Sequence, residues 1–186
     1  MDLNEEKELV KRAKKDPEAF GKLYDQYYSQ IFGYILKRVA NLEIAQDVCS
    51  ETFLKALKNL WKFRWKNISF SFWLYRIANN EISNFFRKRK HKLVSLEKIL
   101  EPIDGSNPEI ELIEAEDRLK MHQDFLKIQE KILKLPPKYQ EVITLRFFEK
   151  KQIKEIGEIL GKKEGTIKSL LHRGLGKLKE DFFETK

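Results

Sequence analysis

Aromatic and cationic side chains alternate in one stretch of the sequence, between residues 61 and 86. The aromatic residues there are Trp61, Phe63, Trp65, Phe70, Phe72, Trp73, Tyr75, Phe85 and Phe86, and they include all three tryptophans of the chain. Lysines and arginines stand between these rings, and the run Arg87-Lys88-Arg89-Lys90 follows them. Surfaces that bind single-stranded nucleic acid combine the same groups, since bases stack on rings and phosphates attract cations. The pattern therefore predicts contact with unpaired bases.

Two positions are open for these rings, a place in the protein core and a place at the surface. Trp61, Phe63 and Phe85 lie on apolar faces, which favours the core. Phe70 and Phe72 belong to a segment expected to form a loop, Asn67-Ile68-Ser69-Phe70-Ser71-Phe72, and for them both positions stay open.

A polar stripe follows on the helix expected over residues 71–90. Its residues are Arg76, Asn80, Ser83 and Arg87, at steps of four, three and four, with Asn79 and Asn84 beside them. Asparagine and arginine can form paired hydrogen bonds with base edges, and arginine also neutralises phosphate. The alternative is a merely hydrated face, but such faces usually mix glutamate with lysine, and Glu81 is the nearby acid here. The stripe is a second candidate for nucleic-acid contact.

The C-terminal part of the chain has the spacing of a helix-turn-helix. Ile153, Ile156 and Leu160 indicate one helix, Gly161 a turn, and Ile167 with Leu171 the next helix. The exposed side of that second helix is expected to carry Lys168, Ser169, His172 and Arg173, with Arg146 and Lys163 placed near phosphates. His172 could equally be an ordinary surface or helix-capping histidine.

Helical patterns cover the rest of the chain. Asp16-Pro17-Glu18 is a helix start, and apolar residues continue at helical spacing to Ile35. A second helix is expected after Asn41, and another must end at Leu135-Pro136-Pro137, before a short helix from Val142 to Phe148. Because no stretch alternates with a period of two, we expect an all-α protein without a sheet.

Charge divides the sequence into three parts. Residues 1–92 carry a net charge of +8, residues 93–118 carry −6 and residues 119–186 carry +6. We therefore expect two small helical domains that bind a polyanion, joined by a turn-rich acidic linker. One cysteine, Cys49, excludes an intrachain disulfide and a cysteine-rich zinc site. The chain lacks a long apolar run and a signal peptide, so we expect a cytoplasmic protein without membrane insertion, metal or cofactor.

Several motifs resemble those of the sigma-70 family of bacterial RNA polymerase initiation factors, in its small extracytoplasmic-function (group four) branch. They are Asp16-Pro17-Glu18-Ala19-Phe20, the segment from Ala45 to Leu54, Trp73-Leu74-Tyr75-Arg76-Ile77-Ala78-Asn79-Asn80, Leu135-Pro136-Pro137-Lys138-Tyr139, and the segment from Glu164 to Arg173. Ser50, Gln46 and Leu170 stand where the family usually has glutamine, glutamate and arginine.

The resemblance implies a factor that binds core RNA polymerase, directs it to promoters and stabilises their melting. Residues 1–92 would be region 2, which reads the minus-10 element through Phe70, Phe72, Trp73, Arg76, Asn79, Asn80, Ser83, Asn84, Arg87 and Lys88. Residues 119–186 would be region 4, which reads the minus-35 element through Arg146, Lys163, Thr166, Lys168, Ser169, His172 and Arg173. Asp47, Glu51, Leu54 and Lys58 would contact the clamp of the largest polymerase subunit, and region 4 the beta flap. The branch also implies an anti-sigma factor.

Other interpretations stay open at this point. The face with Asp47 and Glu51 could be a solvated helix side or, less favourably, half of a metal site. The acidic linker could be a tether or could enter the basic cleft of the polymerase. An autonomous helix-turn-helix regulator would explain the second domain but not the aromatic cluster. An enzyme acting on nucleic acid has little support, because His91, His122 and His172 are scattered. We therefore expect a protein that is not an enzyme.

Overall fold

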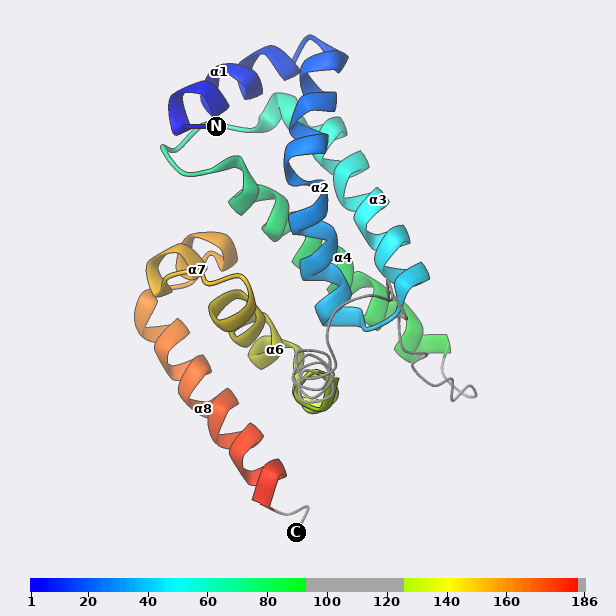
Figure 1. Cartoon of the computed structure of the whole chain (residues 1–186), viewed down its shortest axis with the longest axis vertical. Coiled ribbons are helices and arrows are strands. Elements are labelled where there is room, and N and C mark those ends of the chain that lie inside the picture. The colour runs from blue at the N-terminus through cyan, green and yellow to red at the C-terminus, as the bar shows by residue number, and fades with distance from the viewer. Residues whose placement is uncertain (93–125, 184–186) are drawn as a thin grey trace, which may run out of the picture.

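A computed structural model describes residues 1–92 and 126–183 of the chain. Within these two ranges the regular structure is helical and no strand is present, which confirms the expected all-α class. Figure 1 shows two groups of helices, one formed by α1 to α4 and the other by α6 to α8. The acidic linker expected over residues 93–118 lies outside the described residues. None of the described helices combines the length and the apolar character needed to cross a bilayer.

The first group begins with α1, Leu3–Ala13, whose N-terminus is closed by a capping box between Asp2 and Glu5. Helix α2, Pro17–Val39, starts as the sequence predicts, because the Asp16 carboxylate accepts a hydrogen bond from the Glu18 amide and Pro17 occupies the first turn. Ala40 ends α2 in the left-handed conformation. Asn41 then caps α3, Leu42–Asn59, which runs into the short helix η1, Leu60–Lys62.

Helices α2, α3 and α4 (Phe70–Lys92) pack side by side, and α1 crosses one end of them (Figure 1). Their shared core is apolar and aromatic. It contains Leu23, Ile31, Tyr34, Ile35, Ala45, Cys49, Phe53, Leu74, Tyr75, Ala78 and Ile82. Burial of such side chains stabilises a domain of this size by roughly 1.5–3 kcal/mol for each large residue, before entropy is subtracted.

The second group begins with a helical segment at residues 126–134, which ends before the two prolines as predicted. Helix α6, Pro137–Ile143, continues into a wider π-helical turn, Thr144–Phe148. Helices α7, Ile153–Leu160, and α8, Glu164–Phe183, form the expected helix-turn-helix. Gly161 joins them at φ +64°, a conformation that glycine adopts without the strain that a side chain would cause.

Gly174 lets α8 lie close to α6. A Cβ atom at this position would stand 3.0 Å from Cδ1 of Ile143 and 3.2 Å from Cβ of Tyr139. The sequence alone suggests that Gly174 and Gly176 only weaken the helix. The close packing of α8 on α6 explains why residue 174 is a glycine, whereas a Cβ at Gly176 would meet nothing within 4 Å.

Two expectations about this fold are wrong, and one helix was not predicted. Phe70 and Phe72 do not lie in a loop, because α4 already begins at Phe70. Trp61 is not a core residue, since 69% of its surface is exposed. Helix α1 was not expected at all, although the capping-box spacing of Asp2 and Glu5 indicates its start.

Candidate nucleic-acid interface

The polar stripe predicted on α4 is present at the protein surface. Asn80, Ser83 and Arg87 are exposed, and Arg87 donates a hydrogen bond to Asn84 Oδ1 over 2.9 Å. Asn84 is half-buried and its amide reaches Glu81, which is itself paired with Lys55. Lys88 lies in α4, but its side chain is outside the described part of the structure. The exposed groups of this face, those of Asn80, Ser83 and Arg87, are thus an amide, a hydroxyl and a guanidinium, which can bind bases or phosphates.

Three of the residues predicted to contact the minus-10 element are buried in the core instead. Phe70 and Phe72 are 0% and 7% exposed, so neither ring has a face open to a base. Asn79 is also buried, and its Oδ1 accepts hydrogen bonds from Tyr34 and Arg38, over 2.7 and 2.8 Å. Trp73 is half-buried and packs on Phe70 with ring centroids 5.4 Å apart. In this conformation Asn79 and the two phenylalanines hold α4 in place.

The loop at residues 63–69 places aromatic rings and cations nearer the surface than the buried Phe70 and Phe72. Arg64, Lys66 and Asn67 are exposed, and Trp65 is half-buried with its indole N–H donating to Asn67 Oδ1 over 3.2 Å. Asn67 has φ +55°, which asparagine tolerates better than most residues. The interleaving of rings and lysines in the sequence pointed to this region, but it did not separate the loop from the start of α4.

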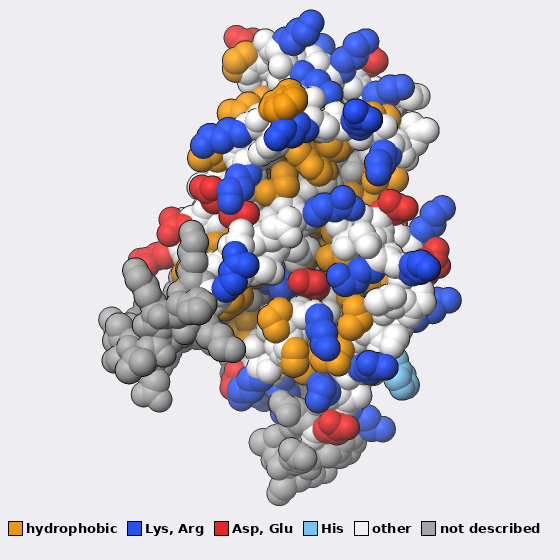
Figure 2. All heavy atoms as spheres, turned by 180° about the vertical axis from the view of Figure 1, so that it is seen from behind, with side chains coloured by type: hydrophobic (Ala, Val, Ile, Leu, Met, Phe, Trp, Pro, Cys, Tyr) orange, Lys and Arg blue, Asp and Glu red, His pale blue; other side chains and the backbone are white. Residues whose placement is uncertain are grey.

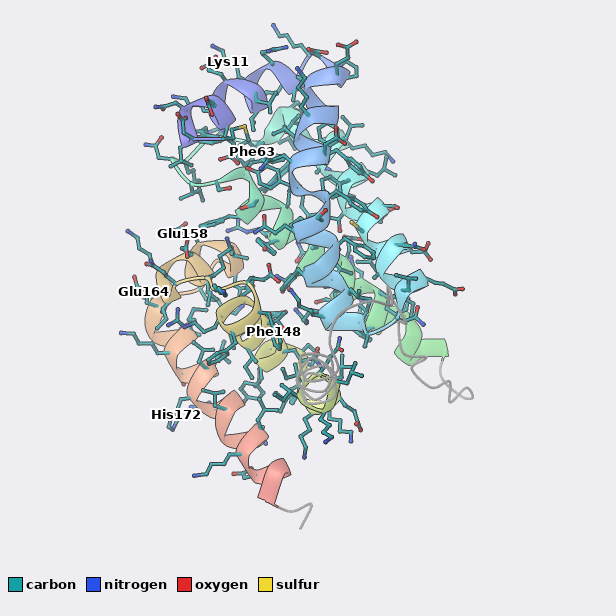
Figure 3. The ribbon with its side chains drawn as sticks, in the orientation of Figure 1. Lys11, Phe63, Phe148, Glu158, Glu164 and His172 are labelled. Atoms are coloured by element: carbon teal, nitrogen blue, oxygen red, sulfur yellow. The ribbon has the colours of Figure 1, made fainter. Side chains whose placement is uncertain are left out.

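Helix α8 and the turn before it present the residues predicted for duplex DNA. Lys163, Thr166, Lys168, Ser169, His172 and Arg173 are all exposed. His172 points away from the body of the domain in Figure 3. Arg146 is also exposed and donates to the Lys151 carbonyl over 3.1 Å. This helix therefore has the polar, basic outer face that a recognition helix needs in a major groove.

Another exposed face lies on α3. Asp47, Glu51, Leu54 and Lys58, the residues that the resemblance assigns to a polymerase contact, are all at the surface. Two large apolar residues that sequence reasoning did not assign to this face extend it, Leu57 at 45% and Trp61 at 69% exposure. They stand four residues apart and so share one side of the helical path. Among the described residues no group of side chains has the composition of a metal site.

Basic residues are spread over both groups of helices. Figure 2 shows lysine and arginine side chains spread over the described part of one face of the molecule, with hydrophobic and some acidic side chains between them. Such a surface attracts a polyanion at long range, and salt weakens the attraction.

The two groups of helices contact each other through the predicted DNA-reading side of α4. Arg76 donates from Nε to the Ile159 carbonyl over 3.0 Å and from its terminal nitrogen to the Glu158 carbonyl over 2.5 Å. These carbonyls belong to the last turn of α7, where helix carbonyls need partners and a positive charge is favourable. The guanidinium of Arg76 is thus engaged within the chain.

Glu149 forms a second connection between the groups. Its carboxylate pairs with Lys37 over 2.9 Å and accepts a hydrogen bond from the Tyr75 hydroxyl over 2.6 Å. Burial, followed by the hydrogen bond to Glu149, raises the pKa of Tyr75. The phenol therefore remains a hydrogen-bond donor at neutral pH.

Arg38 makes the third connection and is 1% exposed. Its guanidinium donates to Tyr34 over 2.9 Å and lies 3.4 Å from Gln140 Oε1 in α6. Gln140 in turn donates to the Leu133 and Leu135 carbonyls. The sequence patterns did not identify Lys37, Arg38 or Glu149, since isolated charges in amphipathic helices are normally solvated.

Comparison with known proteins agrees with these features. Residues 23–92 match the family model described as sigma-70 region 2, and residues 125–178 match that described as sigma-70, region 4. The chain is 35% identical over 173 residues to the ECF RNA polymerase sigma factor SigW of Bacillus subtilis, covering 90% of this chain and 91% of that protein. It is 33% identical over 171 residues to the ECF RNA polymerase sigma factor BldN of Streptomyces coelicolor, covering 90% of this chain but 62% of that longer protein.

Two solved structures have the same fold. CnrH, solved in complex with the cytosolic domain of CnrY, has a TM-score of 0.70 at 19% identity, with 100% of both chains covered. The sigma factor RpoE of Bartonella quintana, solved with the anti-sigma factor NepR, has a TM-score of 0.65 at 19% identity, with 87% of this chain and 94% of that chain covered. With regions 2 and 4 in order and this level of identity to SigW, the chain belongs to the extracytoplasmic-function branch of the sigma-70 family.

Proposed function

We propose that this protein is a transcription initiation factor that binds core RNA polymerase, brings it to specific promoters and stabilises their opening. The observation that carries the proposal is the presence in one chain of regions 2 and 4, each with an exposed polar and basic face. On α8 that face suits duplex DNA. On α4 and the loop at residues 63–69 it suits a separated strand.

The energies explain why such a protein acts within the polymerase. Stacking of one base on an aromatic side chain is worth roughly 1–3 kcal/mol. Opening one duplex step costs about 1.4 kcal/mol. A few captured bases therefore hold a bubble open without driving its formation, and the polymerase cleft must contribute the remainder.

Use of the whole α4 face requires the two groups of helices to separate. Arg76 cannot neutralise a promoter phosphate while it binds the α7 carbonyls at Glu158 and Ile159. Asn80, Ser83 and Arg87 are already exposed. The arrangement in which the two groups of helices contact each other, here called the closed form, is therefore the state before promoter opening. Binding to the polymerase supplies the energy that separates the two groups.

Partners follow from the surfaces and from the relatives. We assign the α3 face with Asp47, Glu51, Leu54 and Lys58 to the clamp of the largest polymerase subunit, with Leu57 and Trp61 as further contacts. Region 4 would contact the beta flap. An anti-sigma factor is a further partner, by analogy with the RpoE–NepR complex. The protein would act in the cytoplasm, as two domains bounded at residues 1–92 and 119–186.

In vitro transcription with core polymerase tests the proposal, using the DNA upstream of the protein's own gene as template. We expect transcripts from that template only when the protein is added. Asn80→Ala should reduce permanganate reactivity of the bubble while polymerase binding persists. Tight binding of the isolated protein to duplex DNA, without any effect on transcription, would favour an autonomous regulator instead.

A further inference from the structure

Helix α1 lies outside the region 2 match, which begins at residue 23, yet it contacts both ends of the loop at residues 63–69. At the beginning of the loop, Lys14 just beyond α1 donates from Nζ to the Phe63 carbonyl over 2.7 Å. At its end, Glu6 binds Ser69 and Phe70. Figure 1 shows the loop passing beside α1 on its way to α4, and Figure 3 shows Phe63 between these helices. The loop is thus bonded at one end to α1 and at the other end to the residue that follows α1.

The contact at Glu6 is a buried carboxylate with three donors. Glu6 is 3% exposed, and its Oε1 accepts from the Phe70 amide over 2.6 Å, the Ser69 hydroxyl over 3.1 Å and the Tyr27 hydroxyl over 2.5 Å. A carboxylate this deeply buried is stable only with such partners. Because the Phe70 amide is the first of α4, Glu6 caps that helix from a distant part of the chain, beside Ser69, whose hydroxyl accepts from the Ser71 amide over 3.2 Å.

Aromatic packing joins the loop to the start of α4. Once α4 starts at Phe70, its ring packs against Phe63 at 5.3 Å and Trp73 at 5.4 Å between centroids. Phe63 in turn lies 6.4 Å from Trp65. The rings of the loop residues Phe63 and Trp65 thus form one cluster with those of Phe70 and Trp73 in α4. The exposed loop residues are Arg64, Lys66 and Asn67. A loop that is ordered before binding loses less entropy when a ligand arrives.

We propose that Glu6 and Lys14 are positioning residues for strand recognition. They hold the loop at residues 63–69 in the conformation in which it contacts an unpaired base of the opened promoter. This inference rests on the proposed function, and it adds α1 to the elements that select the promoter. It predicts that loss of Glu6 reduces discrimination among the four bases more than it reduces the amount of transcript.

The test measures base discrimination directly. Open-complex formation is compared on templates carrying each of the four bases at every melted position, with holoenzymes containing wild type, Glu6→Ala, Glu6→Gln or Lys14→Ala. Glu8→Ala and Lys11→Ala are matched controls, because both residues are exposed on α1 and pair with each other at 3.9 Å. Hydrogen exchange of the peptide covering residues 63–70 reports the loop without any promoter.

We expect Glu6→Ala to reduce discrimination at one or two adjacent positions roughly tenfold, the scale of one stacked base. Lys14→Ala should reduce it by a few fold at the same positions. Glu6→Gln, which retains an oxygen acceptor, should keep most of it, and both controls should match wild type. Hydrogen exchange of the loop should accelerate in Glu6→Ala.

Discrimination equal to wild type in Lys14→Ala and Glu6→Ala, even with weaker overall transcription, would overturn the inference, since a purely structural role lowers all templates alike. If Glu6→Ala does not fold, Lys14→Ala decides the question, because that lysine is exposed and makes one contact with the loop. A wild-type protein without any effect on transcription would instead reject the proposed function. The two failures are thereby separated.

Discussion

Replacement of Glu149 by glutamine should shift the chain from the closed to the open arrangement. The carboxylate joins the two groups of helices through Lys37 and Tyr75. Glutamine has the same shape and can still accept the hydrogen bond from the phenol. It removes the negative charge, and with it the ion pair.

The size of the effect follows from the burial of the pair. The Glu149 side chain is 7% exposed and that of Lys37 is 30% exposed, so the ion pair is partly desolvated and worth more than a surface pair. Loss of the pair, together with the weaker hydrogen bond to a neutral acceptor, should cost about 1–2 kcal/mol. The ratio of open to closed molecules should then rise about 5- to 30-fold.

Distance measurement between the two groups of helices detects this shift. Fluorophores on Glu43→Cys in α3 and Lys177→Cys in α8, both exposed positions, report separation in single molecules. The native cysteine does not interfere, because Cys49 is buried and burial raises its pKa to about 12. Glu180→Gln, an equal change of charge at an exposed position of α8, is the control.

An unchanged distance distribution in Glu149→Gln would refute the reasoning, since the ion pair would then contribute nothing to closure. An equal shift in Glu180→Gln would assign the effect to net charge. Because opening frees Arg76, Glu149→Gln should also increase binding of single-stranded promoter DNA by a similar factor.

Three further predictions concern the second group of helices. Gly174→Ala should lower its free energy of unfolding by about 1–3 kcal/mol through overpacking, whereas Gly176→Ala should raise it by up to about 1 kcal/mol, as measured by urea denaturation. Burial raises the pKa of Glu141, although nearby cations oppose this effect. The contribution of Glu141 to stability is therefore fully present below pH 4.5, its ordinary pKa, and is lost as the pH rises through the raised pKa of the folded protein. Glu141→Gln should therefore stabilise the protein at pH 7 and lose that advantage at pH 4 in the same denaturation assay. Arg173→Ala should cost about 1–3 kcal/mol of minus-35 binding and relax preference at one base, and an equal loss on all sequences would mean a phosphate contact.

The helices with strong local signals could be predicted from the sequence. Asp16-Pro17, Asn41, the two prolines at 136 and 137, and Gly161 each end or begin an element where the structure has one. These residues act on the backbone beside them, through caps, a fixed φ or a left-handed turn. Their effect is therefore visible without knowledge of the fold.

The contacts between distant segments could not be predicted in the same way. Glu6 caps a helix 64 residues further along, and Lys37 pairs with a carboxylate 112 residues away. Phe70 and Phe72 look like loop residues because Ser69, which accepts from the Ser71 amide over 3.2 Å, does not reach the Phe70 amide, and the distant Glu6 accepts from that amide instead. Periodicity indicates which side of a helix is apolar, but it does not specify which charged residue the tertiary fold will cover.

The bond between Arg76 and the end of α7 has a consequence for any affinity measured on the intact chain. Promoter phosphate and the carbonyls of Glu158 and Ile159 are rival ligands for one guanidinium. An apparent dissociation constant for opened DNA therefore equals the intrinsic constant divided by the fraction of molecules whose arginine is unoccupied. Weak binding of opened DNA by the free protein would therefore reflect competition from the α7 carbonyls as well as the strength of the contacts between the protein and DNA.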